Sequence, residues 1–270
     1  MKKYILLLSS FLFIISSCSD EKVLTLDNQE NIQSSRDYLM VEKLINNIYR
    51  SIEEGFIYNG ESKQYPNYNL LNNNPNNNDT LIIDFGEENS LEFGLLKRGK
   101  IISIFNKKYH DSLSVITTSF NQFYMNNILI EGNFQLSCLG ENNEKNKAYN
   151  LEISNTSFTT NEGVININAS YQKELISGSN SRYNLNDDKY LLNGIIAGNS
   201  SNGNEFNVSI IEPILIKLEC FQSSHCITTS GVAIITPENY NSRLINYGDS
   251  LCDCNMNIEL DENNYLIVLD

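Results

Sequence analysis

A two-residue period in hydrophobicity runs from Leu81 to the end of the chain and limits the fold more than any other feature. Apolar and polar residues alternate most clearly in the segments 81–85, 128–136, 165–169 and 206–210. Each alternation predicts a strand with one buried face and one face in water. Turn signals separate these segments, as antiparallel hairpins require, at Asn126-Asn127, Asn161 to Gly163, Asn193-Gly194 and Asn202-Gly203.

These strands predict that residues 81–270 form a single all-β domain. About a dozen strands fit this length, arranged as an antiparallel sandwich or as a curved open barrel or half-barrel. A chain of 270 residues can bury about 70–75% of its extended surface, so one large domain is physically reasonable. The fold class expected is therefore all-β with one helix at its N-terminal side.

That helix is expected over residues 34–55. Apolar side chains recur there at helical spacing, at Val41, Leu44, Ile45, Ile48 and Ile52. Ser34 with Asp37 can cap its start and Gly55 can end it. Its polar side is not basic, which favours a face that docks on the domain over a membrane-surface helix. The Asn-rich stretch 56–80, interrupted by Pro75, is expected to be a loop or linker.

The first residues have the composition of an export signal. Lys2 and Lys3 precede an apolar run of about 12 residues, which is too short to span a bilayer. Small residues then lead to Cys18, so the segment resembles a bacterial lipoprotein signal with its lipobox. The resemblance implies removal of residues 1–17, acylation of Cys18 and a lipid anchor. Residues 18–33 are expected to be a polar tether.

Acidic residues follow this cysteine directly. The run Ser19-Asp20-Glu21 resembles the surface-export signal of Bacteroidetes lipoproteins. It implies display on the outer face of the outer membrane. The alternative is an acidic linker that faces the periplasm.

The region from Leu81 to Asp270 resembles an uncharacterised family of Bacteroidetes lipoproteins. The matching pieces include Ile83-Asp84-Phe85-Gly86, Lys97-Arg98-Gly99-Lys100-Ile101, Val115-Ile116-Thr117-Thr118-Ser119-Phe120, Glu212-Pro213-Ile214 and Tyr247-Gly248-Asp249. The chain departs from the family pattern at Phe93, where an aspartate is usual, and at Ser250, where glycine is usual. Both positions lie in expected turns. The family has no assigned activity, so the resemblance carries no catalytic residues to this chain.

The charge excludes one class of partner. The chain carries a net charge of −14, and loss of Lys2 and Lys3 with the signal makes it −16. Each phosphate contact needs a Lys or Arg, so nucleic acids and anionic head groups are disfavoured. The partners expected are the membrane through the N-terminal lipid, and an outer-membrane protein or a glycan.

Five cysteines remain after Cys18, in a compartment that permits disulfides. If residues 252–260 form a regular strand, both its cysteines face the core, and Cys226 can then pair with Cys252. Cys220 with Cys254 is the natural second bridge. The rival interpretation is a thiolate metal site, but the cysteine spacings do not match those of structural zinc. Cys138 is left as a buried residue or a free thiol.

Three patterns offer weaker signals of chemistry. Acid pairs occur at Glu87-Glu88, Asp187-Asp188 and Asp261-Glu262, and a glycan hydrolase needs two carboxylates across a cleft. Oxygen ligands at Asn184, Asn186, Asp187 and Asp188 suit Ca²⁺, although this loop lacks the glycine and distal glutamate of a calcium loop. Acid–hydroxyl–aliphatic triplets resemble Bacteroidetes O-glycosylation sites and predict exposed loops at Thr80, Ser112 and Ser250.

The sequence thus favours a non-enzymatic binding or accessory lipoprotein. It contains no phosphate-binding loop, nucleophile elbow or HExxH helix. Two alternatives stay open: a secreted glycan hydrolase that uses a carboxylate pair, and an open half-barrel that holds a lipid with the helix as its plug.

Overall fold

The computed structural model describes residues 26–58, 66–72, 78–181, 183–223, 225–261 and 263–268, and for residues 26–31 it describes the backbone alone. The signal segment 1–17, Cys18 and residues 19–25 lie outside the described residues. The elements are α1 (Leu26–Tyr58), β1 (Asn67–Leu70), β2 (Asp79–Asp84), β3 (Ser90–Glu92), β4 (Leu95–Phe105), β5 (Val115–Met125), β6 (Ile128–Glu141), β7 (Lys147–Thr159), β8 (Val164–Ser177), η1 (Leu185–Asp187), β9 (Lys189–Asn199), β10 (Glu205–Lys217), η2 (Leu218–Gln222), β11 (Thr228–Pro237), β12 (Arg243–Asp249), β13 (Asn255–Leu260) and β14 (Asn263–Val268).

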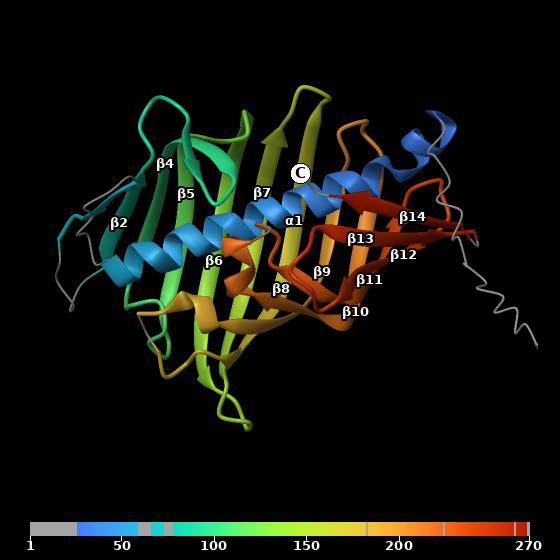
Figure 1. Ribbon diagram of the computed structural model, residues 1–270. Coiled ribbons are helices and arrows are strands. Elements are labelled where there is room, and N and C mark those ends of the chain that lie inside the picture. Colours follow the sequence, from blue (N-terminus) through green and yellow to red (C-terminus); the bar gives the residue numbers. More distant parts are fainter. Residues whose placement is uncertain are drawn as a thin grey trace, which may run out of the picture.

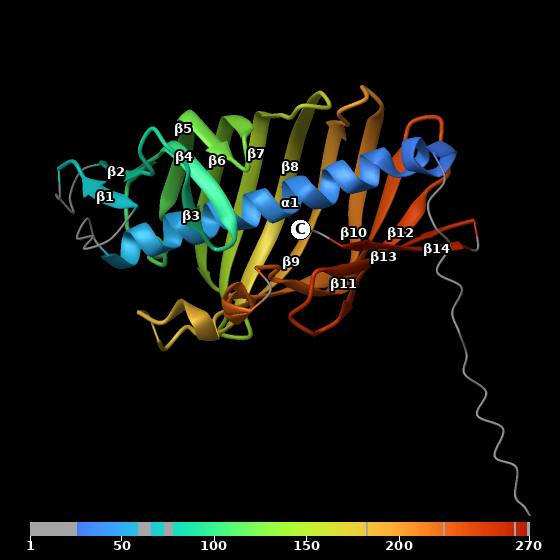
Figure 2. The ribbon, with the colours of Figure 1, turned by 45° about the horizontal axis from the view of Figure 1, so that its top comes forward.

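All the strands belong to one antiparallel sheet in which chain order is spatial order. The path runs from β1 through β2 and β4 to β14, and β3 pairs with β4 beside it. The sheet curves around α1, which crosses its concave face, and the last strands turn forward past the helix (Figures 1 and 2). The expected all-β fold, with an open curved sheet and a single N-terminal helix, is confirmed.

The alternating segments place their apolar residues on the concave side. In β8, for example, Ile165, Ile167 and Ala169 are buried and the residues between them are exposed. The buried faces of the strands form one core together with α1. The outward faces are left to solvent.

One predicted turn is wrong. Asn126-Asn127 does connect β5 to β6, and both residues have positive φ, as a tight hairpin turn requires. Asn193-Gly194, in contrast, lies inside β9. A Cβ on Gly194 would lie 2.5 Å from the backbone oxygen of Ser170 in the neighbouring strand. This glycine therefore reflects a close approach of two strands, not a change of direction.

The helix is longer than predicted at both ends. It begins at Leu26, not at residue 34, and it continues past Gly55 to Tyr58. The expected capping residues Ser34 and Asp37 lie within it and instead contact the β9–β10 turn. A Cβ on Gly55 would lie 2.7 Å from the Leu81 side chain, so this glycine lets the helix approach β2 closely.

The stretch expected to be a linker is partly a strand. β1 lies within the range 56–80 and pairs with β2, and Asp79 begins β2. The Asp79 carboxylate accepts hydrogen bonds from the backbone N–H groups of Asn72 and Thr80, which fixes the return of the chain. Residues 59–65 and 73–77 lie outside the described residues.

The helix is buried on nearly all sides, although its sequence predicts one apolar stripe. Its buried apolar residues are Ile32, Tyr38, Leu39, Val41, Leu44, Ile45, Ile48, Tyr49 and Ile52. Glu42, Asn47 and Glu53 are buried with them. The curved sheet must therefore supply polar partners inside its concave face, and these contacts are the first candidates for a functional site.

Candidate functional site

Near the middle of α1, Glu42 lies among tyrosines. The Tyr247 hydroxyl is 2.5 Å from Glu42 Oε2 and 2.9 Å from the Tyr38 hydroxyl. The other oxygen, Glu42 Oε1, is buried without a hydrogen-bond partner. Burial raises the pKa of Glu42 to about 7. A protonated Glu42 can donate to Tyr247, which frees the proton of Tyr247 for Tyr38, so the neutral acid completes this chain of hydrogen bonds.

A second carboxylate lies near the C-terminal end of the helix. Glu53 Oε1 accepts a hydrogen bond of 2.7 Å from Tyr190 and lies 3.3 Å from His110 Nε2. On its other side His110 contacts the Tyr149 hydroxyl at 2.6 Å. Burial alone would raise the pKa of Glu53, but the bond to His110 and the nearby ammonium of Lys173 outweigh it, and the pKa is lowered.

The hydrogen-bonded chain of Glu53, His110 and Tyr149 resembles a catalytic proton relay, but its hydroxyl groups are not accessible to a substrate. Tyr149 is 1% exposed and Tyr190 is fully buried. A nucleophile must reach its substrate, and neither hydroxyl can do so in this arrangement. The cluster therefore joins α1 to β7 and β9 and offers no catalytic centre.

Further polar contacts hold the two ends of α1. At the N-terminal end, Asp37 Oδ2 accepts hydrogen bonds from the backbone N–H and the hydroxyl of Ser201, at 2.6 and 2.8 Å. At the other end, the Tyr68 hydroxyl of β1 donates to Glu54, which also pairs with Arg50 within the helix. Lys97 of β4, fully buried, donates to the Ser51 hydroxyl of the helix at 3.0 Å and pairs with Glu92 of β3. The helix is therefore held along its whole length.

The four cysteines near the C-terminus form two disulfides, but the expected pairing is wrong. Cys220 is bonded to Cys252, and Cys226 is bonded to Cys254. The predicted pairing required a regular strand from residue 252, but β13 begins only at Asn255, and Cys252 and Cys254 lie in irregular backbone before it. Together the bridges join η2 and the segment between η2 and β11 to the β12–β13 loop.

The other cysteine within the described residues is Cys138, a free thiol buried in β6.

The expected calcium loop is a capped turn. The Asn184 side chain accepts from the backbone N–H of Asn186 at the start of η1, and Asp187 accepts from the Ser181 hydroxyl. Asp188 turns away towards Tyr190. In the described part of the chain, no group of three or more His, Cys, Asp or Glu side chains is placed to hold a metal ion.

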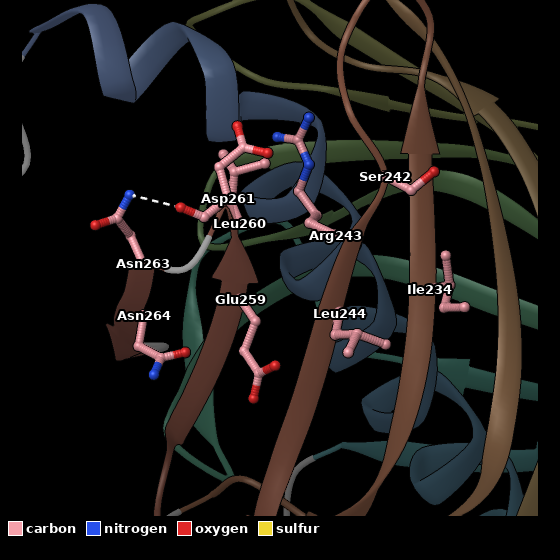
Figure 3. A pocket seen from close by; sticks show the side chains of 9 residues that line it. All are labelled: Ile234, Ser242, Arg243, Leu244, Glu259, Leu260, Asp261, Asn263 and Asn264. Atoms are coloured by element: carbon pink, nitrogen blue, oxygen red, sulfur yellow. Dashed lines mark hydrogen bonds between the residues drawn. The ribbon is translucent and has the colours of Figure 1, made fainter.

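A wide groove crosses the outer face of the last four strands (Figure 3). It measures about 530 Å³, within the usual range for ligand pockets. Ile234, Leu244, Glu259 and Asn264 lie opposite one another in successive strands along it. Asp261 adds a second carboxylate at the rim, but no aromatic side chain lines the groove. A glycan hydrolase here would lack a stacking surface for sugar.

The other acid pairs offer no better cleft. Glu87 and Glu88 are exposed next to β2, and Asp187 is exposed beside the buried Asp188. Glu262 lies outside the described residues.

The outer face of β6–β9 is a lattice of amides and hydroxyls. One row of facing residues consists of Ser137, Asn150, Gln172 and Asn193. A parallel row contains Gln135, Glu152, Ser170 and Ile195. We call these eight residues the outer lattice. Strands lie about 4.8 Å apart, so the lattice repeats its donors and acceptors at that spacing.

The outer lattice carries no basic side chain. The only Lys or Arg within residues 131–137, 150–159, 164–174 and 191–199 is Lys173. Lys173 faces inward, and its ammonium lies 3.6 Å from the centre of the Tyr190 ring. The same ranges contain three glutamates, Glu131, Glu152 and Glu174, of which only Glu152 belongs to the outer lattice. The lattice is therefore nearly uncharged on a strongly acidic protein.

The three glycosylation candidates differ in accessibility. Ser112 is exposed in a turn, as expected. Thr80 lies half-buried in β2, because the strand begins before it. Ser250 is half-buried, and its backbone N–H and C=O bind Thr229 and Lys217. Whether any of the three carries sugar stays a prediction.

Sequence reasoning missed the buried carboxylates of α1 and the outer lattice. The apolar stripe predicted for residues 34–55 covers one face of the helix only, and it assigned no role to Glu42 or Glu53. The lattice was visible as Asn, Gln and Ser at alternate positions of the predicted strands. What alternation could not show is which of these side chains face one another, because that depends on register.

No protein-family model, curated protein or solved structure matches this chain. None of the helices in the described ranges has the length and apolar character needed to cross a bilayer. In structural terms the protein belongs to the all-β class, with a single open antiparallel sheet that curves around one long helix.

Proposed function

We propose that this protein is a lipid-anchored, surface-exposed lipoprotein that works as a non-enzymatic binding module for neutral glycans. The observation that carries the proposal is the outer lattice. Asn and Gln amides present donors and acceptors together, which suits the hydroxyl groups of uncharged sugars. The lack of Lys and Arg disfavours phosphate-bearing and other anionic polymers.

The filled concave face supports this proposal over a lipid carrier. A lipid could enter the curved sheet only by displacing α1. Seven of the buried apolar residues of the helix are Ile, Leu or Val, and at about 1.5–3 kcal/mol each their burial stabilises docking by roughly 10–20 kcal/mol. The outer face is available to a ligand without any such cost.

The glycan proposal predicts that one row of the lattice is needed for binding. The triple variant Asn150→Ala, Gln172→Ala, Asn193→Ala removes three amides that point away from the core, so the fold should be kept. Against immobilised neutral polysaccharides we expect binding to be about 5- to 30-fold weaker, the loss of one or two hydrogen bonds at about 1 kcal/mol each. Binding is measured by biolayer interferometry.

A matched triple, Asn143→Ala, Asn161→Ala, Asn180→Ala, removes three exposed loop amides and should bind like the wild type. Equal loss in both triples, or no binding to any neutral glycan, would overturn the proposal. Cross-linking on intact cells distinguishes the other class of partner. A stoichiometric outer-membrane protein recovered without glycan binding would identify an accessory subunit instead.

Anchoring through Cys18 gives an independent prediction. The variant Cys18→Ser cannot be acylated, so the protein should move from the membrane to the soluble fraction and lose metabolic labelling by an alkyne analogue of palmitate. A single chain binds membranes marginally and several bind stably, so the shift should be nearly complete. Cys138→Ala, which removes a buried thiol, is the control and should stay membrane-bound. Retention of Cys18→Ser through a carbonate wash would contradict the anchor.

A further inference from the structure

A small cavity lies beside the start of β7, the end of β8 and the start of β9, separate from the outer lattice. It is lined by His110 and Asp111 of the β4–β5 loop, Lys147 of β7, Leu175 of β8, Gly178 and Ser179 of the loop after β8, and Asp188 just before β9. The volume in which the centre of a water molecule can be placed without a clash is about 80 Å³. One water needs about 10–15 Å³ of such space, so the cavity admits a molecule of about five to eight non-hydrogen atoms.

The carboxylates of Asp111 and Asp188 and the ammonium of Lys147 line this cavity. Asp188 is 3% exposed, and its one side-chain hydrogen bond, from Tyr190 to Oδ2, is long at 3.4 Å. Its other oxygen lies against Gly178, where a Cβ would come within 1.8 Å of it. Lys147 donates to the backbone oxygen of His110 at 2.8 Å. Among the ion pairs of the described residues there is none between Lys147 and Asp188.

Burial and the neighbouring Glu53 raise the pKa of Asp188 to about 7, although the Lys173 ammonium lowers it in part. A ligand that places a second positive charge against this carboxylate would stabilise its ionised form. Here the buried Asp188 carboxylate and the Lys147 ammonium line the same small space, while the exposed Asp111 and the Ser179 hydroxyl lie at its rim. A single molecule with an ammonium group and a carboxylate group complements both charges at once. Small amino acids, with five to seven non-hydrogen atoms, have this chemistry and this size.

We propose that this cavity is a binding site for a small zwitterionic amino acid such as glycine or alanine. The ammonium of the ligand would contact Asp188 and its carboxylate would contact Lys147. Leu175 closes the apolar side, which limits the ligand to a short side chain. This site is independent of the glycan surface, since none of its residues belongs to the outer lattice.

The probe ligands are glycine and alanine, with acetate, methylammonium and leucine for comparison. At a concentration of about five times the dissociation constant, we expect glycine or alanine to raise the melting temperature of the full-length protein by about 2–4 °C. Acetate and methylammonium each satisfy one charge and should give no resolved shift. Leucine should be excluded by size. Titration calorimetry gives the affinity.

Asp188→Asn and Lys147→Met should each weaken glycine binding at least about tenfold, whereas Lys108→Met, an exposed lysine of the neighbouring loop, should not. If Asp188→Asn fails to fold, Ser179→Leu tests the same site, because it fills the rim of the cavity from an exposed loop position. The proposal is overturned if neither amino acid binds, or if binding survives unchanged in folded Lys147→Met and Ser179→Leu proteins.

Discussion

Replacing Glu42 with glutamine is expected to stabilise the protein increasingly as the pH rises. Burial raises the pKa of Glu42 from 4.5 to about 7. In the unfolded chain the acid ionises above pH 4.5, while in the folded protein it stays protonated up to about pH 7. Each unit of difference is worth 1.36 kcal/mol, so the wild type loses about 3 kcal/mol of stability between these two pH values.

Glutamine keeps the shape of Glu42 and cannot ionise, so the variant avoids this loss. We expect the difference in unfolding free energy between Glu42→Gln and the wild type to grow by about 2–3 kcal/mol from pH 5 to pH 8.5. Urea unfolding followed by tyrosine fluorescence at several pH values measures it. Glu131→Gln, on the outer face, is the control and should run parallel to the wild type. A constant offset for Glu42→Gln across the whole range would show that Glu42 is ionised in the folded protein.

Removing either disulfide is expected to lower the free energy of unfolding by about 3–4 kcal/mol. The bridges connect residues separated by 32 and 28 positions, and loops of this length are worth about 3–4 kcal/mol in the chain-entropy description. The double variants Cys220→Ser, Cys252→Ser and Cys226→Ser, Cys254→Ser should each lose that amount in denaturant unfolding. Because the two loops overlap, removal of both bridges should cost less than the sum.

The connectivity can be read directly by peptide mapping. Chymotrypsin cleaves after Phe221, between Cys220 and Cys226, and an aspartate-specific protease cleaves before Asp253, between Cys252 and Cys254. Mass spectrometry of the unreduced digest should find the Cys220 peptide joined to the one that ends at Cys252. A peptide that joins Cys226 to Cys252 would contradict the structure.

The parts of this fold that could be predicted are those that depend on local periodicity. Alternation located the strands, since residues such as Ile165 and Ile167 are buried on one face whatever the rest of the chain does. The helix boundaries could not be found in this way. Considered alone, the sequence from Leu26 to Gln33 resembles a polar tether. In the structure these residues form the first turns of α1.

The candidate site was less predictable for the same reason. Nothing in the sequence distinguishes Glu42 and Glu53 from other polar residues of the helix. Their hydrogen bonds to Tyr247 and Tyr190 form because the curved sheet places these tyrosines against α1. The cysteine set was predicted but its pairing was not, because the irregular backbone of residues 250–254 decides which sulfur atoms meet. Tertiary geometry, not residue type, determined these outcomes.

The length of α1 also limits how many strands the sheet can place against it. Its 33 residues rise about 1.5 Å each and so span about 50 Å. The helix crosses the strands steeply (Figure 1). At a strand spacing of about 4.8 Å, about ten strands fit along the helix, and the remaining strands must bend past the helix ends. Gain or loss of one hairpin would change the width of the sheet by about 10 Å. A matching change of about six residues in α1 would then be needed to keep the concave face filled.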